Sequence, residues 1–374
     1  MKQPEISVGI LSTSDIQIHY NPANDSFVIP NVPIGIHFHW ERKEDQEFRG
    51  ELKIIREGNQ LTVINKIPIE EYLTSVISSE MSAMSDLEFL KAHAVISRSW
   101  LLAQKEKSSQ LQQPETNYAS VVETDEEYIR WYDREDHARF DVCADDHCQR
   151  YQGITRAFTP EVTKAVESTW GEVLLYEDQI CDTRFSKCCG GRTEKFENCW
   201  EPVPHPYLES VDDPFCHTDD PGILRRILND YDQATSDFYR WQVTYSQDEI
   251  SRLINRKSGW DFGKIKDLIP VERGTSGRIV RLKIVGTQMT KTVGKELFIR
   301  KILSKSHLYS SAFEVEKEYA DEDVPVKFRL TGSGWGHGVG LCQIGAAVMA
   351  QKGYTYREIL AHYFPHSVLK KIYS

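Results

Sequence analysis

Four sets of residues in this 374-residue chain combine side-chain type and spacing in a way that could support chemistry. The first is a single acid, Glu80, at the C-terminal end of a segment with helical periodicity (67–81). The helix macrodipole disfavours negative charge at that end, and an acid in an unfavourable place has a raised pKa. A raised pKa suits a general acid. The alternative is a glutamate that is merely solvated at a helix end.

The second set is a compact group of two histidines and two cysteines: His137, Cys143, His147 and Cys148. Zinc prefers tetrahedral nitrogen and sulfur ligands, and two thiolates cancel its charge. The spacing differs from that of a zinc finger, and the adjacent pair at 147 and 148 needs a turn to aim both side chains at one point. A Cys143–Cys148 disulfide and free core cysteines are the alternatives that the spacing leaves open.

The third set is a glycine-rich stretch at 332–346, where five of the first nine residues are glycine. Glycine is kept where φ is positive or where backbones approach closely. The run therefore predicts a shaped loop from which Trp335, His337 and Gln343 can project. An Ala-rich helix is expected at 344–352, with Gly353 as its C-cap. A packed corner between a strand and a helix is the alternative, and a phosphate-binding loop is disfavoured because no Lys or Thr follows the glycines.

The fourth set surrounds a glycine pair, Gly190 and Gly191. Ser186, Arg192 and Thr193 flank the two glycines, which predict a turn. We therefore expect a polar lip at this point of the chain.

The elements that must position these residues change in type along the chain. Short β-branched and aromatic runs predict a small antiparallel β unit at residues 1–66. Helical periodicity then predicts one helix at 67–81 and a second after Ser85 or Asp86, with further helices at 160–168 and 246–257. Strands are expected near 265–269, 278–285 and 298–303. We expect an α+β fold with a β-rich region at 1–66, a larger region at 67–374, and insertions around 107–136 (with a helical patch at 126–132) and 216–245.

The net charge and the distribution of apolar residues argue against several kinds of partner. A net charge of −11 argues against nucleic acid, which requires clustered Lys and Arg. No stretch approaches the roughly 18 to 20 apolar residues of a membrane span, and the first residues do not form a secretory signal. Seven of the eight cysteines lie between 143 and 216, which favours a metal site or a local cross-link. The sequence leaves open the compartment and the state of five of them: Cys181, Cys188, Cys189, Cys199 and Cys216.

Together these stretches resemble the SpoIID/LytB family of bacterial peptidoglycan proteins, from about residue 65 to 374. The resemblance is carried, in family order, by SSEMSAMSDLEFLKAHAVISRSWLLA, HCQRYQG, FSKCCGGRTE, CWEPVPHPYLESVDDP and GSGWGHGVGLCQIGA. It implies a SpoIID-like mixed core with a glycan-binding groove, a catalytic glutamate at Glu80, and zinc on the histidine–cysteine group. Two features depart from the family: Ser82 stands where proline usually follows Glu-Met, and no export signal is visible although members typically lie in the cell envelope.

The resemblance predicts a lytic transglycosylase that cleaves peptide-denuded peptidoglycan strands between MurNAc and GlcNAc. Glu80 would protonate the glycosidic oxygen and then act as base while the sugar's 6-hydroxyl closes a 1,6-anhydro ring, which requires only one acid. The zinc would be structural, since four protein ligands leave no open position. A non-catalytic glycan-binding enhancer of a cell-wall amidase, and a hydrolase that uses the metal, are the competing functions. The expected substrate contacts are Arg98 (which also braces Glu80), Ser186, Gly190, Gly191, Arg192, Thr193, Trp335, His337 and Gln343.

Overall fold

The structure is a computed structural model that describes residues 3–36, 41–111, 120–132, 137–157, 159–218, 220–230, 232–233, 237–320 and 323–374, without the side chains of 108–111. Helices and several small sheets alternate along the chain, so the predicted α+β class is confirmed. The predicted boundary between residues 66 and 67 remains a prediction.

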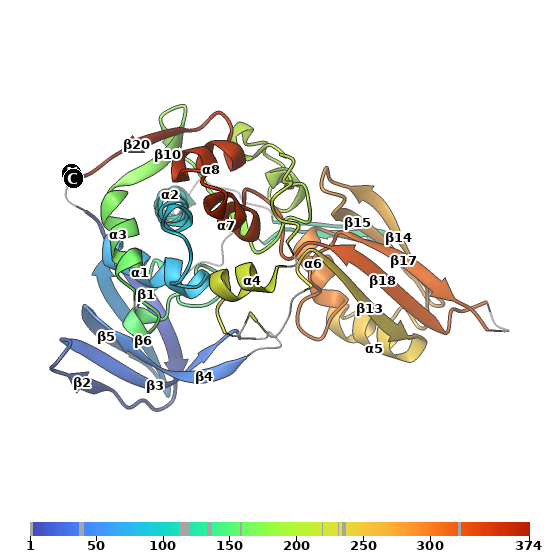
Figure 1. The fold of residues 1–374 in the computed structure, drawn as a ribbon. Coiled ribbons are helices and arrows are strands. Elements are labelled where there is room, and N and C mark those ends of the chain that lie inside the picture. Colours follow the sequence, from blue (N-terminus) through green and yellow to red (C-terminus); the bar gives the residue numbers. More distant parts are fainter. Residues whose placement is uncertain are drawn as a thin grey trace.

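The chain begins with two small sheets, which confirms the strands expected before residue 66 (Figure 1). One sheet has the order β2-β3-β4 and the other β5-β6-β1-β9, and all pairings are antiparallel except that of β9 with β1. The parallel β9 comes from far along the chain and anchors the histidine–cysteine segment to this sheet. The strands are β1 (Glu5–Thr13), β2 (His19–Asn21), β3 (Ser26–Ile34), β4 (Arg42–Phe48), β5 (Glu51–Glu57), β6 (Gln60–Pro68) and β9 (Val142–Cys143).

A group of helices forms the centre of the molecule around α2, which packs against α1, α3, α7 and α8 (Figure 1). The helix α1 begins after Pro68 and carries two acids in its first turn, which the macrodipole favours. Its apolar stripe, Leu73, Val76 and Ile77, is fully buried, and the chain turns extended at Met81. The helices are α1 (Ile69–Glu80), α2 (Leu87–Leu111), α3 (Pro160–Ser168), α4 (Pro221–Ile227), α7 (Gln343–Gln351) and α8 (Tyr356–Tyr363).

Short strands connect these helices. The sheet β11-β10-β20 includes the strand near the C-terminus, and the two-stranded parallel pair β12-β19 brings residue 186 beside residue 342. This pair places the predicted polar lip next to the end of the glycine-rich stretch. The strands are β10 (Glu172–Tyr176), β11 (Gln179–Ile180), β12 (Phe185–Ser186), β19 (Leu341–Cys342) and β20 (Val368–Lys371).

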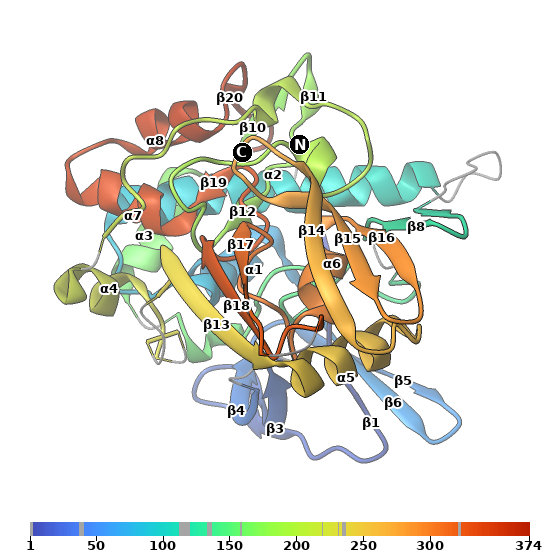
Figure 2. The same cartoon turned by 90° about the vertical axis from the view of Figure 1, so that its right-hand side faces the viewer.

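A second hydrophobic core has its buried residues between Trp241 and Leu330 and lies beside the helical part (Figures 1 and 2). It is enclosed by the sheets β13-β18-β17 and β14-β15-β16-β8-β7 and by α5 and α6. The helix predicted at 246–257 is confirmed as α5, which has a capping box on Ser246. The elements are β7 (Val121–Glu123), β8 (Glu127–Arg130), β13 (Arg240–Ser246), α5 (Gln247–Ser258), β14 (Ile265–Arg273), β15 (Ile279–Gly286), β16 (Thr290–Gly294), α6 (Glu296–Ile302), β17 (Phe313–Glu318) and β18 (Lys327–Ser333).

Two local predictions are wrong in this part of the chain. Residues 298–303, expected as a strand, lie mostly in α6, because its apolar side chains at 298, 299 and 302 point into the second core at helical spacing. The helical patch expected at 126–132 is instead the strand β8, which pairs in parallel with β16. Residues 112–119 and 133–136 of the first expected insertion, and 219, 231 and 234–236 of the second, lie outside the described residues.

Candidate functional site

The carboxyl group of Glu80 is buried at the C-terminal end of α1. Its Oε1 accepts a 2.9 Å hydrogen bond from the backbone N–H of Arg150, and the Arg150 Nε lies 4.0 Å from Oε2. The Lys187 ammonium donates to the backbone carbonyl of Glu80 (3.1 Å) and to Asp232 (2.7 Å). Arg150 also reaches Asp232, at 3.4 Å. Two cations therefore hold a pair of buried carboxylates in one small network.

The environment shifts these two carboxyl groups in opposite directions. Burial raises the pKa of Glu80, and nearby Asp146 adds to the rise, against the opposing charges of Arg150 and Lys187. Burial acts on Asp232 too, but Lys187 and Arg150 outweigh it and lower the pKa of that group. Carboxyl groups whose pKa values are separated in this way are typical of sites that need one protonated and one ionised acid.

Sequence reasoning missed Arg150, Lys187 and Asp232. Arg150 and Lys187 lie inside the stretches HCQRYQG and FSKCCGGRTE, so their motifs were recognised but their contact with Glu80 was not. Asp232 lies in a loop without a local signal, and only the tertiary structure brings it to this point.

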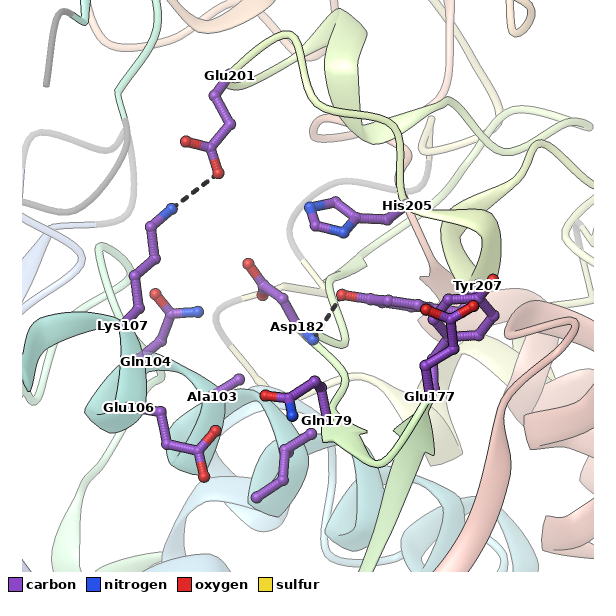
Figure 3. Close-up of a pocket in the computed structure, with 12 residues that line it drawn as sticks. Ala103, Gln104, Glu106, Lys107, Glu177, Gln179, Asp182, Glu201, His205 and Tyr207 are labelled. Atoms are coloured by element: carbon purple, nitrogen blue, oxygen red, sulfur yellow. Dashed lines mark hydrogen bonds and ion pairs between the residues drawn. The ribbon is translucent and has the colours of Figure 1, made fainter. Parts of the chain in front are cut away.

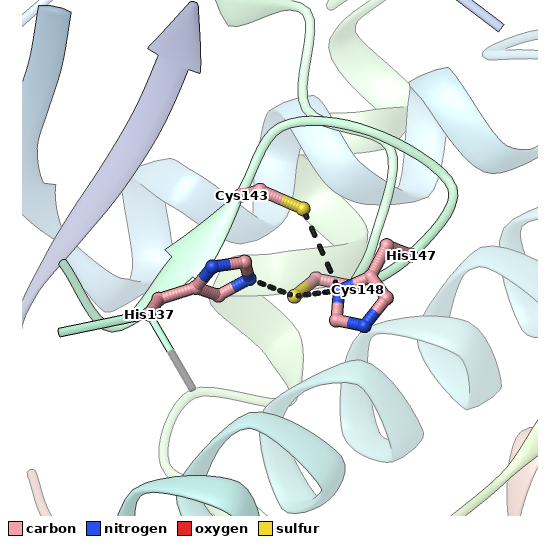
Figure 4. A group of neighbouring side chains, drawn as sticks. All are labelled: His137, Cys143, His147 and Cys148. Atoms are coloured by element: carbon pink, nitrogen blue, oxygen red, sulfur yellow. Dashed lines mark hydrogen bonds between the residues drawn. The ribbon is translucent and has the colours of Figure 1, made fainter. Parts of the chain in front are cut away.

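The four side chains of the histidine–cysteine group point toward one another (Figure 4). Their ligand atoms all lie within 4.8 Å of one another. Cys148 Sγ is 3.4 Å from His137 Nε2 and 3.5 Å from His147 Nδ1, near the roughly 3.3–3.8 Å edges of a tetrahedron with zinc-like bond lengths. Hydrogen bonding with Cys148, and with both imidazoles, lowers the pKa of the Cys143 thiol to about 2, so it is poised as the thiolate that a metal needs.

The turn that this group requires is present. The backbone N–H of Cys148 donates to the carbonyl of Asp145 (3.0 Å), which aims the adjacent residues 147 and 148 at the same point. The group can hold a metal ion, and it is linked to Glu80 because Arg150 follows Cys148 by two residues.

The glycine-rich stretch is wrapped around a buried arginine that sequence reasoning did not single out, Arg278. Its Nε donates to the carbonyl of Gly336 (3.1 Å) and its Nη1 to that of Cys189 (3.0 Å). A Cβ added at Gly338 would overlap the guanidinium carbon, and one at Gly334 would lie 2.9 Å from Nη2. Both glycines also have positive φ, of +78° and +75°. Close approach and backbone conformation together explain the glycines.

The aromatic residues of this stretch are half-buried and packed. Trp335 stacks on Tyr309, with ring centroids 4.4 Å apart, and its backbone pairs with that of Cys188. His337 packs edge-on against Trp200, and its Nδ1 accepts from the backbone N–H of Val339 (3.0 Å). Burial, with nearby arginines, lowers the pKa of His337 well below its usual value, which favours the neutral form of this imidazole.

Gln343 and Arg98 have other partners than expected. Gln343 is buried and lies 3.0 Å from the ring of His93, whose pKa burial lowers to about 3. Arg98 is fully buried and pairs with Glu70, with Nη2 and Oε2 2.6 Å apart. Glu70 is at the opposite end of α1 from Glu80, about 15 Å along the axis. Arg98 therefore braces the start of α1 and not Glu80, a correction that the helical pattern alone could not supply.

The predicted polar lip lies against the glycine-rich stretch. Gly190 and Gly191 have φ of +89° and +116°, and a Cβ on Gly190 would lie 3.0 Å from the backbone nitrogen of Gly334. Ser186 is buried, and Arg192 is exposed and pairs with Asp212 (2.7 Å). The Thr193 hydroxyl accepts from the backbone of residue 211 (2.8 Å). Their role in binding a substrate remains a proposal.

A cavity of about 440 Å³ lies elsewhere, between the distal part of α2 and the β10–β11 turn (Figure 3). Figure 3 shows that mostly polar and acidic side chains line it, with Lys107 paired to Glu201 and the Tyr207 hydroxyl accepting a hydrogen bond from the backbone N–H of Asp182. None of the residues that line it belongs to the predicted site.

The fold places one buried acid, Glu80, close to a group of two histidines and two cysteines. Comparison with known families assigns residues 57–176 to the Stage II sporulation protein (SpoIID) family, and residues 194–340 to a domain of unknown function. Residues 57–176 therefore belong to the SpoIID family, as the motifs predicted, and the named relatives extend the similarity over most of the chain. Among the described residues, we find no helix with the length and apolar character to cross a membrane.

Curated relatives agree with this assignment. The chain is 28% identical to the Stage II sporulation protein D of Bacillus subtilis (strain 168), over 84% of this chain and 77% of that protein. It is 27% identical to an uncharacterized protein of Brachyspira hyodysenteriae (strain ATCC 49526 / WA1), over 85% and 71% of the two chains. It is 25% identical to a B. subtilis protein named Amidase enhancer, over 79% of this chain and 40% of that protein.

Proposed function

We propose that this protein is a peptidoglycan lytic transglycosylase in which Glu80 is the acid and the base. The observation that carries the proposal is the burial of this one carboxyl group, with a raised pKa, beside two cations. Membership of the SpoIID family supports a substrate in the cell wall.

The reaction needs no water. Protonated Glu80 gives its proton to the glycosidic oxygen between MurNAc and GlcNAc, the C1–O bond breaks, and the GlcNAc end leaves as an alcohol. The 6-hydroxyl of the MurNAc unit then attacks its own C1 and passes its proton to the Glu80 carboxylate, which restores the acid. The product carries a 1,6-anhydro end. Lys187 and Arg150 prevent the carboxylate formed midway from being an unpaired buried charge.

The metal that the family implies would be held by His137, Cys143, His147 and Cys148, whose atoms converge at suitable separations. A Zn²⁺ with four protein ligands is structural and would fix the loop that ends at Arg150. This chain's own contribution is the backbone N–H of Arg150, which orients the Glu80 carboxyl group.

The glycan is proposed to lie along the polar lip and the glycine-rich stretch. Trp335 and His337 are half-buried there, and Gly190, Gly191, Ser186, Arg192 and Thr193 border the loop. Gln343 would act indirectly through His93.

The test is digestion of peptide-denuded glycan strands, with anhydro-ended products detected by mass spectrometry. Glu80→Gln keeps the size and the hydrogen-bond acceptor of the side chain, so we expect a folded protein that yields no anhydro product. Normal product from this variant would refute the assignment. Glu71→Gln, an exposed acid of the same helix, is the matched control and should keep full activity.

A second candidate function is enhancement of a cell-wall amidase, which the relative of that name favours. In this case the protein binds glycan strands without cleaving them. Stem-peptide release that appears only with an added amidase, and no anhydro ends from the protein alone, would select this function.

A further inference from the structure

A second cluster of side chains able to bind a metal lies in the hydrophobic core around the central helices, apart from the histidine–cysteine group. It consists of Cys189, Asp213, Cys216 and Cys342, whose ligand atoms all lie within 4.8 Å of one another. The four side chains come from three separate segments, and each residue is at most 2% exposed. Neither the proposed reaction nor the first metal group uses them.

The separations suit tetrahedral coordination. Cys189 Sγ lies 3.6 Å from Cys216 Sγ and 3.2 Å from Asp213 Oδ2. A metal with bonds near 2.3 Å has ligand atoms about 3.8 Å apart, so a small contraction or expansion of the cluster would seat the ion. A sulfur–sulfur separation of 3.6 Å is far from a covalent disulfide, which measures about 2.05 Å.

Asp213 brings a buried carboxyl group to the cluster. Its oxygens accept from the backbone N–H groups of Phe215 (2.9 Å) and Cys216 (3.2 Å) and from the Tyr363 hydroxyl (2.9 Å). Within the described part of the chain, no lysine or arginine forms an ion pair with it. An isolated buried carboxylate is costly to desolvate, so such a group takes up a proton, is paired, or coordinates a metal.

Groups next to the cluster contact its side chains in the way that orients the ligands of a metal site. The Cys342 sulfur caps α7 and accepts from the backbone N–H groups of Gly345 (3.4 Å) and Cys189 (3.3 Å), which stabilise a thiolate. The Tyr363 hydroxyl orients the carboxylate from α8. A Cβ on Gly345 would overlap both that hydroxyl and the carboxylate, so glycine leaves the room they need. Such outer contacts orient ligands and tune affinity.

We infer that Cys189, Asp213, Cys216 and Cys342 form a second, buried structural site for a thiophilic divalent cation such as Zn²⁺. Binding releases the protons of the three thiols, and the ion bonds to three thiolates and one carboxylate. No oxidant or reductant is required. With every position occupied by protein, the ion is structural.

The site would support Glu80 through a different segment of the chain than the first metal group does. Lys187 lies two residues before Cys189 and contacts the Glu80 carbonyl, while Arg150 lies two residues after Cys148 and contacts the Glu80 carboxyl group. The second ion would join the Lys187 segment to α7 and α8 and so position that ammonium. Lys187 is a positioning residue in this account.

The test is metal content by mass spectrometry of the full chain purified under reducing conditions and dialysed against Zn²⁺. We expect two ions per chain in the unaltered protein, one in Cys148→Ser, one in Cys216→Ser, and two in Cys181→Ser, a buried thiol outside both clusters. Asp213→Asn is expected to weaken the second ion by more than about tenfold. Two ions in Cys216→Ser would overturn the proposal.

A second measurement decides the matter if Cys216→Ser does not fold. Cys148→Ser loaded with Co²⁺ should show the sulfur-to-metal charge-transfer and tetrahedral ligand-field bands of a thiolate site. Absence of these bands, or a disulfide between two of the cluster's cysteines in place of the ion, would refute the inference. Loss of glycan cleavage has no bearing on either readout, so this proposal and the proposed function fail independently.

Discussion

The charge of Arg150 beside Glu80 can be removed without disturbing the hydrogen bond that orients the acid. Arg150 contacts this carboxyl group in two ways, through its backbone N–H (2.9 Å to Oε1) and through its side-chain Nε (4.0 Å from Oε2). Arg150→Gln deletes the second contact and keeps the first, because every residue except proline has a backbone N–H. The substitution therefore isolates the electrostatic effect of the guanidinium on Glu80.

The expected magnitude follows from the separation. Two unit charges 4 Å apart attract by about 4 kcal/mol at an effective dielectric constant near 20, and about 1.4 kcal/mol corresponds to one pH unit. Asp146 and Asp232 share the same guanidinium, at 2.6 and 3.4 Å, so Glu80 receives only part of its effect. We expect the titration midpoint of Glu80 to rise by about 1 to 2 pH units in Arg150→Gln.

The assay is the pH dependence of glycan cleavage, together with infrared difference spectra of the carboxyl group between each protein and its Glu80→Gln derivative. A general acid works while protonated, so the fall in activity at high pH should move to higher pH with the infrared midpoint. Arg156→Gln is the matched control, since Arg156 pairs with Glu44 and Asp230 instead. An infrared midpoint that stays in place or falls in Arg150→Gln would refute the electrostatic reasoning, whatever the activity.

Three further predictions concern stability, measured by urea denaturation. Arg98→Met should lower the free energy of unfolding by about 3–5 kcal/mol, because it leaves the buried Glu70 without its cation. The titration midpoint of Glu80 should stay unchanged in this variant. Gly338→Ala should lower the free energy of unfolding more than Gly353→Ala does. Both glycines have positive φ, which costs alanine about 1–2 kcal/mol, but only at Gly338 would the new Cβ also meet a buried guanidinium. Equal losses in the two variants would contradict this prediction. The pKa of Glu80 is higher in the folded than in the unfolded protein, where it is about 4.3. The stabilising contribution of this carboxyl group is therefore complete below about pH 4.3 and is lost as the pH rises through the folded-state pKa. Because glutamine does not titrate, Glu80→Gln should gain stability relative to the unaltered protein across that pH range. A difference that does not change with pH would contradict the last prediction.

Local patterns in the sequence were sufficient where the contacts are local. The histidine–cysteine group spans twelve residues, so its spacing made a metal site one of the open interpretations and the family resemblance favoured it; the structure brings the candidate ligand atoms together. The helices at 67–81 and 160–168 were predicted from periodicity and from proline at their starts. The strand predicted at 298–303 was wrong because a short apolar run fits a buried helix as well as a strand.

By itself, the sequence determined the α+β class, the resemblance to the SpoIID family, the local grouping of two histidines and two cysteines, and the glycine-rich loop. The tertiary structure alone decided which charges meet: Arg98 with Glu70, Arg150 with Glu80, and Lys187 with Asp232. It also decided that Arg278 fills the glycine-rich loop. Periodicity tells which face of a helix is buried but not which distant residue packs against it. The cluster around Cys342 could not be read from the chain for the same reason, because Cys342 lies 153 residues after Cys189 and meets it only when the core forms.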